Sequence, residues 1–239
     1  MACRMFGYAG ASESDVRALH AGLKCACEND PSLQGIAAGC SRHCHGWGYV
    51  IHAANGLFHY RTAKSIYGDD APLPKMEGDI RAIFHGRFAS DTALIAPIFS
   101  HPFVAATEKE VVFLAHNGGV KPDHLPARTV DSEWALEQII RAGGVKEALP
   151  NLKEHTGSAL NLLVLSISRS PGTPGTLLGL NYFKSKEEAP QRNYYEMYLA
   201  AMPGGVAFVS STFTHYSENV KGLAITGPAP FGELLTLAP

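Results

Sequence analysis

The stretch Cys3-Arg4-Met5-Phe6-Gly7-Tyr8 stands close to the start of this chain and ends at Ala9-Gly10. A short apolar run bounded by a turn signal is typical of a buried strand. The sequence therefore predicts a buried first strand that begins with a cysteine.

Further strands and two helices are predicted outward from this stretch. Ser12 or Ser14 caps the first helix and Asn29-Asp30-Pro31 closes it, whereas the second begins at Asp131 or Ser132. The second helix stops at Gly143-Gly144, and a shorter helical piece runs on to His155. Turn residues, among them Asn117-Gly118-Gly119, separate the remaining strands, which are expected over residues 47–53, 57–62, 80–88, 111–116, 160–167, 177–183, 194–201 and 206–211.

Helical stretches set between two groups of strands fit an α+β plan in which helices cover packed antiparallel sheets. The 239 residues are within the size range of one domain, and we expect a single domain over 1–239. A formal net charge of −2 does not favour binding to nucleic acid or to an anionic membrane. The longest apolar run, 160–167, is far shorter than the roughly 20 residues of a membrane span, and no basic segment precedes an apolar core at the N-terminus, so a cytoplasmic location is expected.

Cys3 is a candidate nucleophile because removal of Met1 and Ala2 would give it a free α-amine beside its own thiol. The pKa of an α-amino group is ordinarily about 7.7–8.0, so it can accept the thiol proton near neutral pH. The alternative interpretation is a small core residue on a first strand, which is a common place for a free cysteine.

Three later segments supply groups that such a nucleophile needs. Arg87 and Ser90 follow an apolar strand, where a guanidinium can grip a carboxylate. Asn117 and Gly118 offer a side-chain and a backbone N–H to a developing oxyanion. Asp131 can hold an ammonium group at a helix start. Taken singly, each has an ordinary alternative, namely a surface ion pair, a turn and an N-cap.

The order of these segments resembles that of the class II glutamine amidotransferases, which belong to the N-terminal nucleophile hydrolases. The motifs that resemble this family are Cys3 to Tyr8, Gly46-Trp47-Gly48, His85 to Ser90, His116-Asn117-Gly118 and Asp131-Ser132-Glu133. They cover roughly the first 135 residues. The resemblance implies a four-layer αββα sandwich and a stand-alone glutaminase domain that needs no cofactor.

The resemblance also implies a role for each matching residue. The Cys3 thiol would attack the side-chain amide of glutamine, and Asn117 with the Gly118 N–H would hold the oxyanion. Arg87 would bind the α-carboxylate of the substrate and Asp131 its α-ammonium group. Ser90 and Gly119 would line the substrate pocket. His85 and His116 are interpreted as structural neighbours of the site.

Two positions depart from the family pattern. Ala2 stands between Met1 and Cys3, so the chain is expected to be weak or inactive until Ala2 is removed. His45 stands where the family usually has Asp before Gly-Trp-Gly. Beside it, Cys40, His43, Cys44 and His45, with Cys25 and Cys27 upstream, have the donor types of a zinc site, but their spacing favours a reduced loop without metal.

Three functions are therefore open. The first is hydrolysis of glutamine through a cysteinyl thioester, with ammonia passed to a separate synthase subunit. The second is hydrolysis of another γ-glutamyl amide or γ-glutamyl thiol compound, as in the ergothioneine pathway. The third is a catalytically silent binding or metal-holding protein with the same fold, for which Ala2 and His45 argue. A second copy of the chain in a homodimer is a further expected partner.

Overall fold

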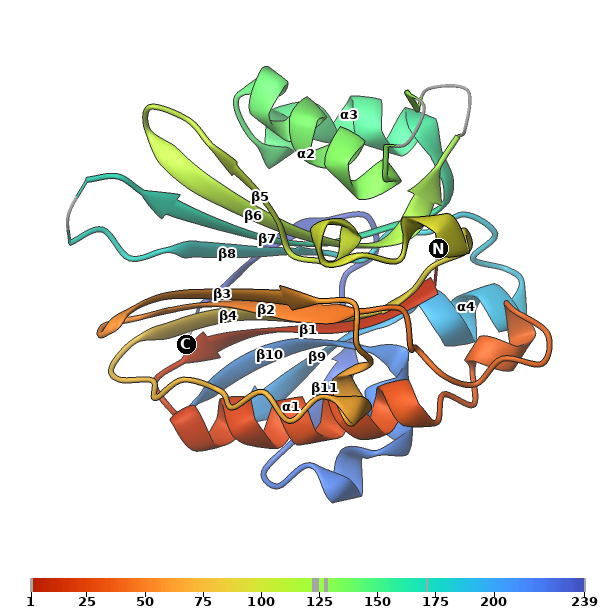
Figure 1. Ribbon diagram of the computed structural model, residues 1–239, viewed down its shortest axis with the longest axis horizontal. Coiled ribbons are helices and arrows are strands. Elements are labelled where there is room, and N and C mark those ends of the chain that lie inside the picture. The colour runs from red at the N-terminus through yellow and green to blue at the C-terminus, as the bar shows by residue number, and fades with distance from the viewer. Residues whose placement is uncertain (1, 122–124, 127–128, 171, 239) are drawn as a thin grey trace.

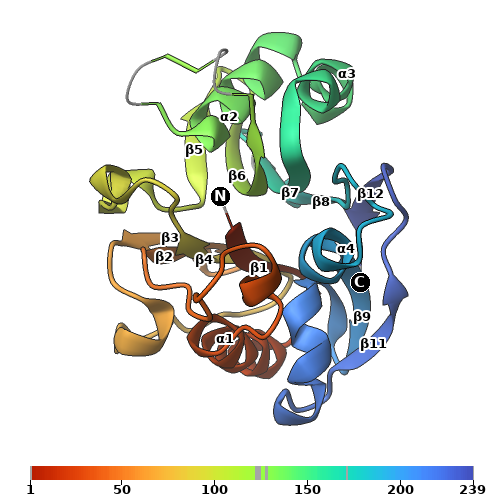
Figure 2. The same cartoon turned by 90° about the vertical axis from the view of Figure 1, so that its right-hand side faces the viewer.

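Two antiparallel sheets stack face to face, and helices cover both outer faces (Figures 1 and 2). The computed structural model describes residues 2–121, 125–126, 129–170 and 172–238. The layers run from α1 through a seven-stranded sheet and a five-stranded sheet to α2 and α3. The predicted α+β class and its four-layer αββα arrangement are confirmed.

The seven-stranded sheet has the order β11-β9-β10-β1-β4-β2-β3, so the first strand of the chain lies in its middle. Its strands are β1 (Ala2–Gly10), β2 (Trp47–Ala53), β3 (Gly56–Thr62), β4 (Ile80–Phe88), β9 (Met197–Met202), β10 (Gly205–Ser210) and β11 (Ala224–Pro228). The five-stranded sheet has the order β12-β8-β7-β6-β5. Its strands are β5 (Phe103–Ala106), β6 (Glu110–Val120), β7 (Thr156–Ser168), β8 (Thr176–Leu180) and β12 (Leu234–Leu237).

The helices are α1 (Glu13–Glu28), α2 (Asp131–Ala142), α3 (Val145–His155) and α4 (Ala189–Tyr195). The Ser12 side chain accepts a hydrogen bond from the Asp15 N–H and caps α1 as predicted. Gly143, with a φ of 81°, ends α2 in the left-handed conformation that glycine adopts without strain. Within the described ranges, none of the helices has the length and apolar character that a membrane crossing requires.

Successive side chains of β1 point to opposite faces of its sheet, so they pack in two different hydrophobic cores. Met5 packs between the two sheets with Ile83 and Leu163, whereas Phe6 packs under α1 with Phe84. Odd-numbered residues of β1 therefore face the second sheet, and even-numbered ones face the helical layer.

Several predicted boundaries differ from the structure, including the end of β8 at Leu180 and the start of β7 at Thr156, and two differences bear on the site. The sequence predicts one strand over residues 194–201, but Tyr194 and Tyr195 end α4 and β9 begins only at Met197. Pro190 in the first turn of α4 favours a helix start, and burial of both tyrosines outweighs their strand propensity. The three strands β5, β11 and β12 were not predicted, because each has only four or five residues.

The second correction concerns Asn117-Gly118-Gly119, for which the sequence predicts a turn between strands. They lie inside β6, where the register against β7 shifts between Gly118 and Val120. A bulge of this kind re-aims side chains within a strand. The candidate oxyanion donors therefore lie on a sheet and not on a loop.

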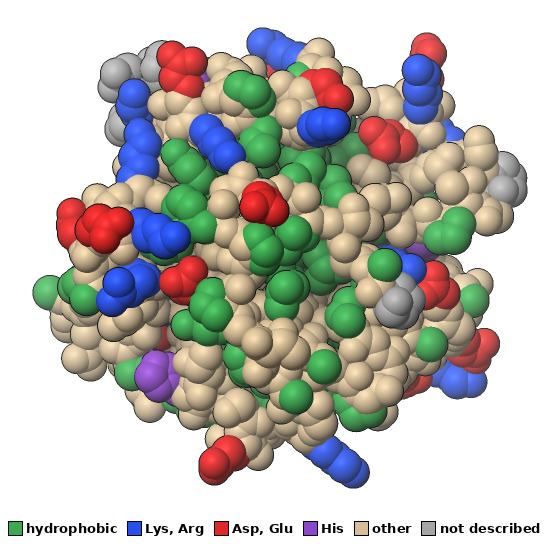
Figure 3. All heavy atoms as spheres, turned by 180° about the vertical axis from the view of Figure 1, so that it is seen from behind, with side chains coloured by type: hydrophobic (Ala, Val, Ile, Leu, Met, Phe, Trp, Pro, Cys, Tyr) green, Lys and Arg blue, Asp and Glu red, His purple; other side chains and the backbone are tan. Residues whose placement is uncertain are grey.

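The side of the molecule on which β11 and β12 lie shows hydrophobic side chains gathered between charged ones (Figure 3). A cavity of about 300 Å³ lies there between the two sheets, with Leu199, Val206 and Leu235 in its lining. None of the predicted site residues is among the residues that line it.

Candidate active site

Cys3 lies near the start of β1, and the N-terminal end of β1 lies at one end of the sandwich (Figure 2). As an odd-numbered residue it shares its face with Met5, toward the five-stranded sheet. It stands opposite Arg87 of β4 in the strand register, and its side chain is fully buried. The strand geometry thus brings Cys3 together with Arg87 of the predicted motif His85 to Ser90.

Asn117 of β6 reaches Cys3 from the other sheet. The Cys3 backbone N–H donates to Asn117 Oδ1 at 3.0 Å, although the two residues are 114 positions apart. The Nδ2 group of the same carboxamide is buried and has no hydrogen-bond partner among the described residues. An unsatisfied buried N–H group is costly, so this donor is suited to an oxygen atom of a bound molecule.

Gly118 and Gly119 bring the β6 bulge close to neighbouring backbone. Gly118 has a φ of 152°, and a Cβ atom there would collide with the carbonyl oxygen of Ala159, so only glycine fits. A Cβ atom on Gly119 would lie 3.6 Å from Asp131 Oδ2 and 3.4 Å from Ser158 Oγ. The bulge therefore places Gly119 beside the predicted ammonium-binding carboxylate.

Arg87 is a buried cation without an ion-pair partner in the described part of the chain. Its side chain is 1% exposed, and Nη1 donates to the carbonyl oxygens of Leu94 at 2.8 Å and His45 at 3.4 Å. Its Nε atom has no partner among the described residues. Because buried charges normally meet an opposite charge, Arg87 is suited to receive a carboxylate from outside the protein.

Asp131 and Ser90 occupy different environments. Asp131 is the first residue of α2 and is 8% exposed, with Ser132 Oγ 3.4 Å from its Oδ1 atom. Ser90 lies beyond the end of β4, and its side chain is exposed. The pocket-lining role of Ser90 stays a prediction, while Asp131 is within electrostatic reach of both Cys3 and Arg87.

Burial raises the pKa of the Cys3 thiol to about 11. A hydrogen bond from the Phe88 backbone and the positive charge of Arg87 oppose this rise, and Asp131 adds to it. At neutral pH the thiol is therefore protonated. A nucleophile in this state needs a base to take its proton.

A cluster of three buried histidines lies behind Asp131. His101, which the sequence did not single out, has Nε2 at 2.7 Å from Ser132 Oγ, and His116 Nδ1 lies 3.2 Å from the same oxygen. The ring centroids of His85 and His101 are 3.9 Å apart. Burial lowers the pKa of all three rings, that of His85 to about 3, so the cluster is neutral and holds Ser132 beside Asp131.

His45 lies beside the end of β4. Its Nδ1 atom accepts a hydrogen bond from the Ala89 N–H at 3.0 Å, and its ring stacks on Phe88 at 5.1 Å between centroids. Burial lowers its pKa, which keeps the ring neutral. His45 thus fixes the segment that follows Arg87, and its own carbonyl oxygen contacts Arg87.

The structure points the side chains of the Cys-His loop in different directions. His43 is buried against Asp30, Cys40 is half-buried and Cys44 is exposed, while Cys25 and Cys27 lie in the last turn of α1. No three of the described His, Cys, Asp or Glu side chains converge in a way that would hold a metal ion. All five cysteines are free thiols.

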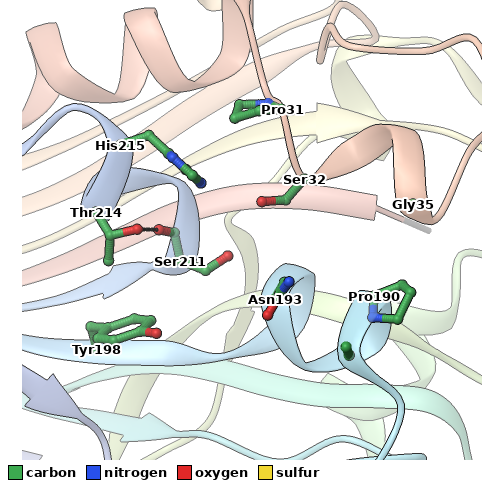
Figure 4. A pocket seen from close by; sticks show the side chains of 10 residues that line it. Pro31, Ser32, Gly35, Pro190, Asn193, Tyr198, Ser211, Thr214 and His215 are labelled. Atoms are coloured by element: carbon green, nitrogen blue, oxygen red, sulfur yellow. Dashed lines mark hydrogen bonds between the residues drawn. The ribbon is translucent and has the colours of Figure 1, made fainter.

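Cavity size alone does not locate this site. A pocket of about 580 Å³ lies elsewhere, between the loop after α1 and α4, and is lined by Ser32, Asn193, Ser211 and His215 among others (Figure 4). It contains no cysteine, arginine or carboxylate. Leu94, whose carbonyl oxygen accepts from Arg87, lines a cavity of about 550 Å³ together with Asp91 and Phe99, but Arg87 itself is not among its lining residues.

The four-layer arrangement, with β1 in the middle of one sheet, is the fold of the N-terminal nucleophile glutamine amidotransferase structures. The glutamine phosphoribosylpyrophosphate (PRPP) amidotransferase from B. subtilis, in complex with ADP and GMP, is similar over 98% of this chain and 47% of its own, with a TM-score of 0.64 and 19% identity. The allosteric regulatory enzyme of purine biosynthesis is similar over 98% of this chain and 46% of its own, with a TM-score of 0.56 and 17% identity.

A third structure, of a predicted glutamine amidotransferase from Pseudomonas aeruginosa PA01, covers 99% of this chain and 93% of its own at 14% identity and a TM-score of 0.46. This chain spans about half the length of the first two proteins. No protein-family model matches the sequence, and no curated protein is similar to it. At 19% and 17% identity the similarity to the first two structures shows a shared fold, so the chemistry has to be argued from the site.

Proposed function

We propose that this chain is a glutaminase that hydrolyses the side-chain amide of glutamine through a Cys3 thioester and releases ammonia for a separate acceptor enzyme. The observation that carries the proposal is the Asn117 carboxamide. Its oxygen holds the Cys3 nitrogen, while its buried Nδ2 group has no partner among the described residues. A hydrogen-bond donor of this kind, close to the nucleophile, is what a developing oxyanion requires.

The proposed reaction has two halves. The Cys3 sulfur attacks the amide carbon of glutamine, and the carbonyl oxygen becomes an oxyanion held by Asn117 Nδ2 and the Gly118 N–H. Donors of this kind contribute roughly 3–4 kcal/mol each to the transition state. The amide nitrogen takes a proton and leaves as ammonia. Water then attacks the γ-glutamyl thioester, which releases glutamate and restores the thiol.

The base in this reaction is the α-amine of Cys3. A thiol with a pKa of about 11 does not ionise by itself at neutral pH. With Met1 and Ala2 attached, the Cys3 nitrogen is an amide, which has no useful basicity. Once they are removed, the amine stays in reach of Asn117 Oδ1 and can carry the proton from the thiol to the leaving ammonia.

Arg87 and Asp131 are proposed to hold the two charged groups of the substrate amino acid. Arg87→Gln is expected to raise KM for glutamine by about 10- to 100-fold, because a charge-assisted hydrogen bond to the carboxylate is lost. Asp131→Asn is expected to raise KM in the same direction. Steady-state kinetics on both variants, in protein that begins at Cys3, measure this effect.

Arg81→Gln is a matched control for Arg87→Gln, since Arg81 is also a buried arginine on β4 but pairs with Asp79 at the opposite end of the strand from Arg87. Its KM should stay within about twofold of the parent value. An Arg87→Gln protein with an unchanged KM would rule out Arg87 as the carboxylate partner.

Product analysis tests the proposed reaction itself. Protein that begins at Cys3 is incubated with glutamine and with a panel of other γ-glutamyl amides and γ-glutamyl thiol compounds, and glutamate release is measured. Turnover of glutamine with the highest kcat/KM supports the proposal. Preference for another γ-glutamyl compound would replace it with the second hypothesis, and a folded protein that acts on none would leave the catalytically silent one.

A further inference from the structure

The backbone of Cys3 lacks a strand neighbour on one side. β1 pairs with β10 only from Phe6 onward, so Cys3 extends beyond that ladder. Its two backbone polar groups are bound by side chains: Asn117 accepts from its N–H, and the Tyr194 hydroxyl donates to its C=O at 3.3 Å. Side chains from two other elements therefore set where this residue lies.

Tyr194 is itself held by Arg4. The Arg4 guanidinium carbon lies 3.8 Å from the centroid of the Tyr194 ring, and Nη1 donates to the Tyr194 carbonyl oxygen at 2.8 Å. Both residues are fully buried. Because Arg4 is even-numbered on β1, it points away from the thiol side of the strand and meets Tyr194 on the face toward the helical layer.

Asp30 fixes the position of Arg4. Arg4 Nε donates to Asp30 Oδ2 at 2.6 Å, His43 Nε2 lies 2.7 Å from the same oxygen, and Thr212 Oγ1 donates to Oδ1 at 2.9 Å. Burial alone would raise the pKa of Asp30, but Arg4 and His43 outweigh burial and lower it, so the carboxylate is ionised.

A buried ion pair of this kind is not in itself a good source of stability, because desolvation of two charges offsets their attraction. Its geometry is nevertheless tightly defined by the contacts to Asp30, Tyr194 and Ser211, whose hydroxyl accepts from Arg4 at 3.4 Å. Ser211 also lines the pocket of Figure 4, so the network extends from that pocket to the nucleophile. We therefore interpret the buried Arg4–Asp30 pair as a means of orienting Tyr194, and not as a source of stability.

We infer that Arg4 is a positioning residue that acts on Cys3 through Tyr194, with Asp30 as its anchor. This inference rests on the proposed function of Cys3 as the nucleophile. Through the hydrogen bond from Tyr194 to the Cys3 carbonyl oxygen, Asp30 and Arg4 fix the backbone orientation of Cys3, and with it the directions of its thiol and its α-amine. It does not contact the substrate, so it affects the chemical step and leaves substrate binding unchanged.

Tyr194→Phe tests the last link, since it removes the hydroxyl and keeps the ring on which Arg4 stacks. In protein that begins at Cys3, kcat for glutamine is expected to fall about 3- to 10-fold, as the loss of one hydrogen bond predicts, with KM within about twofold. Tyr8→Phe is the matched control, because it removes a hydroxyl at the other end of β1 that contacts Asp15 and Gly204. Its kcat should not change.

A double variant tests whether Arg4 acts through Tyr194. Arg4→Lys keeps the charge beside Asp30 and loses the stacking, so it is expected to lower kcat by a similar factor. The double variant Arg4→Lys/Tyr194→Phe should then be no slower than the slower single variant. If the fall in kcat of the double variant equals the product of the two single falls, Arg4 does not act through Tyr194. An unchanged kcat in Tyr194→Phe would overturn the inference as well.

A second measurement keeps this inference separate from the proposed function and from any folding defect of Arg4→Lys. The rate at which iodoacetamide alkylates Cys3 is followed by mass spectrometry of the N-terminal peptide, which needs no substrate. Tyr194→Phe is expected to raise this rate by about threefold, because the backbone is less restrained. A parent protein without glutaminase activity would contradict the proposed function but not the positioning role. An equal alkylation rate in parent and Tyr194→Phe would contradict the positioning role, whether or not the parent is active.

Discussion

Replacing Cys3 with alanine is expected to lower turnover of glutamine by at least about 10⁴-fold, because no thioester forms without the thiol. The substitution should leave the fold intact, since alanine keeps the Cβ atom of this buried side chain and removes a single sulfur atom. Glutamate release and circular dichroism, both on protein that begins at residue 3, measure the two parts of this expectation.

Cys27→Ala is the matched control for this substitution. Cys27 is also a fully buried thiol whose pKa burial raises, but it lies in the last turn of α1 and packs against Gly86 of β4. Its removal should reduce stability slightly and leave kcat unchanged. Equal losses in the two variants would show that thiol removal acts through packing, and an active Cys3→Ala protein would remove Cys3 from the mechanism.

Removal of Met1 and Ala2 is expected to raise glutaminase activity by about 10²- to 10⁴-fold, the usual contribution of a general base. The base is present only when the Cys3 nitrogen is an amine. The comparison uses three proteins that begin at Met1, Ala2 and Cys3, and only the third should be fully active. A protein beginning at Ala2 that works as well as the third would show that another group takes the proton.

The pH dependence of kcat/KM identifies the base independently. Only the neutral amine accepts a proton, so the rate of the protein that begins at Cys3 should rise with pH and level off above a pKa near about 8. With Met1 and Ala2 attached, ionisation depends on the thiol, whose pKa is about 11, and any residual rate should still be rising at roughly pH 9. The same profile in both proteins would contradict the role of the amine.

Much of the fold was predictable because its signals are local. The apolar run before Ala9-Gly10 predicted β1, and the 3.6-residue spacing after Ser12 predicted α1 with its cap. The ends of β2 and β4 were also predicted correctly at 47–53 and 80–88. The short edge strands and α4 were missed, because their few residues pack against partners far away in the sequence.

The candidate site was predictable only as a set of motifs in order. Asn117 was expected at a turn, and the structure places it inside β6, aimed at Cys3. His101 and Tyr194 gave no local signal, since a histidine before a proline and a tyrosine in an apolar stretch are ordinary. Their contacts to Ser132 and to the Cys3 carbonyl oxygen depend on how the two sheets and α4 are packed.

The sequence by itself determined the α+β class through its pattern of strands and helices, and the resemblance of its motifs to the class II glutamine amidotransferases implied the four-layer sandwich and made Cys3 the candidate nucleophile. Only the tertiary structure decided which groups meet at Cys3. Asn117 and Tyr194 lie 114 and 191 residues away from it, and strand register with sheet stacking brings them to its N–H and C=O. The packing of the two sheets also buries the Cys3 thiol and so raises its pKa to about 11, because no single segment can exclude water from a side chain.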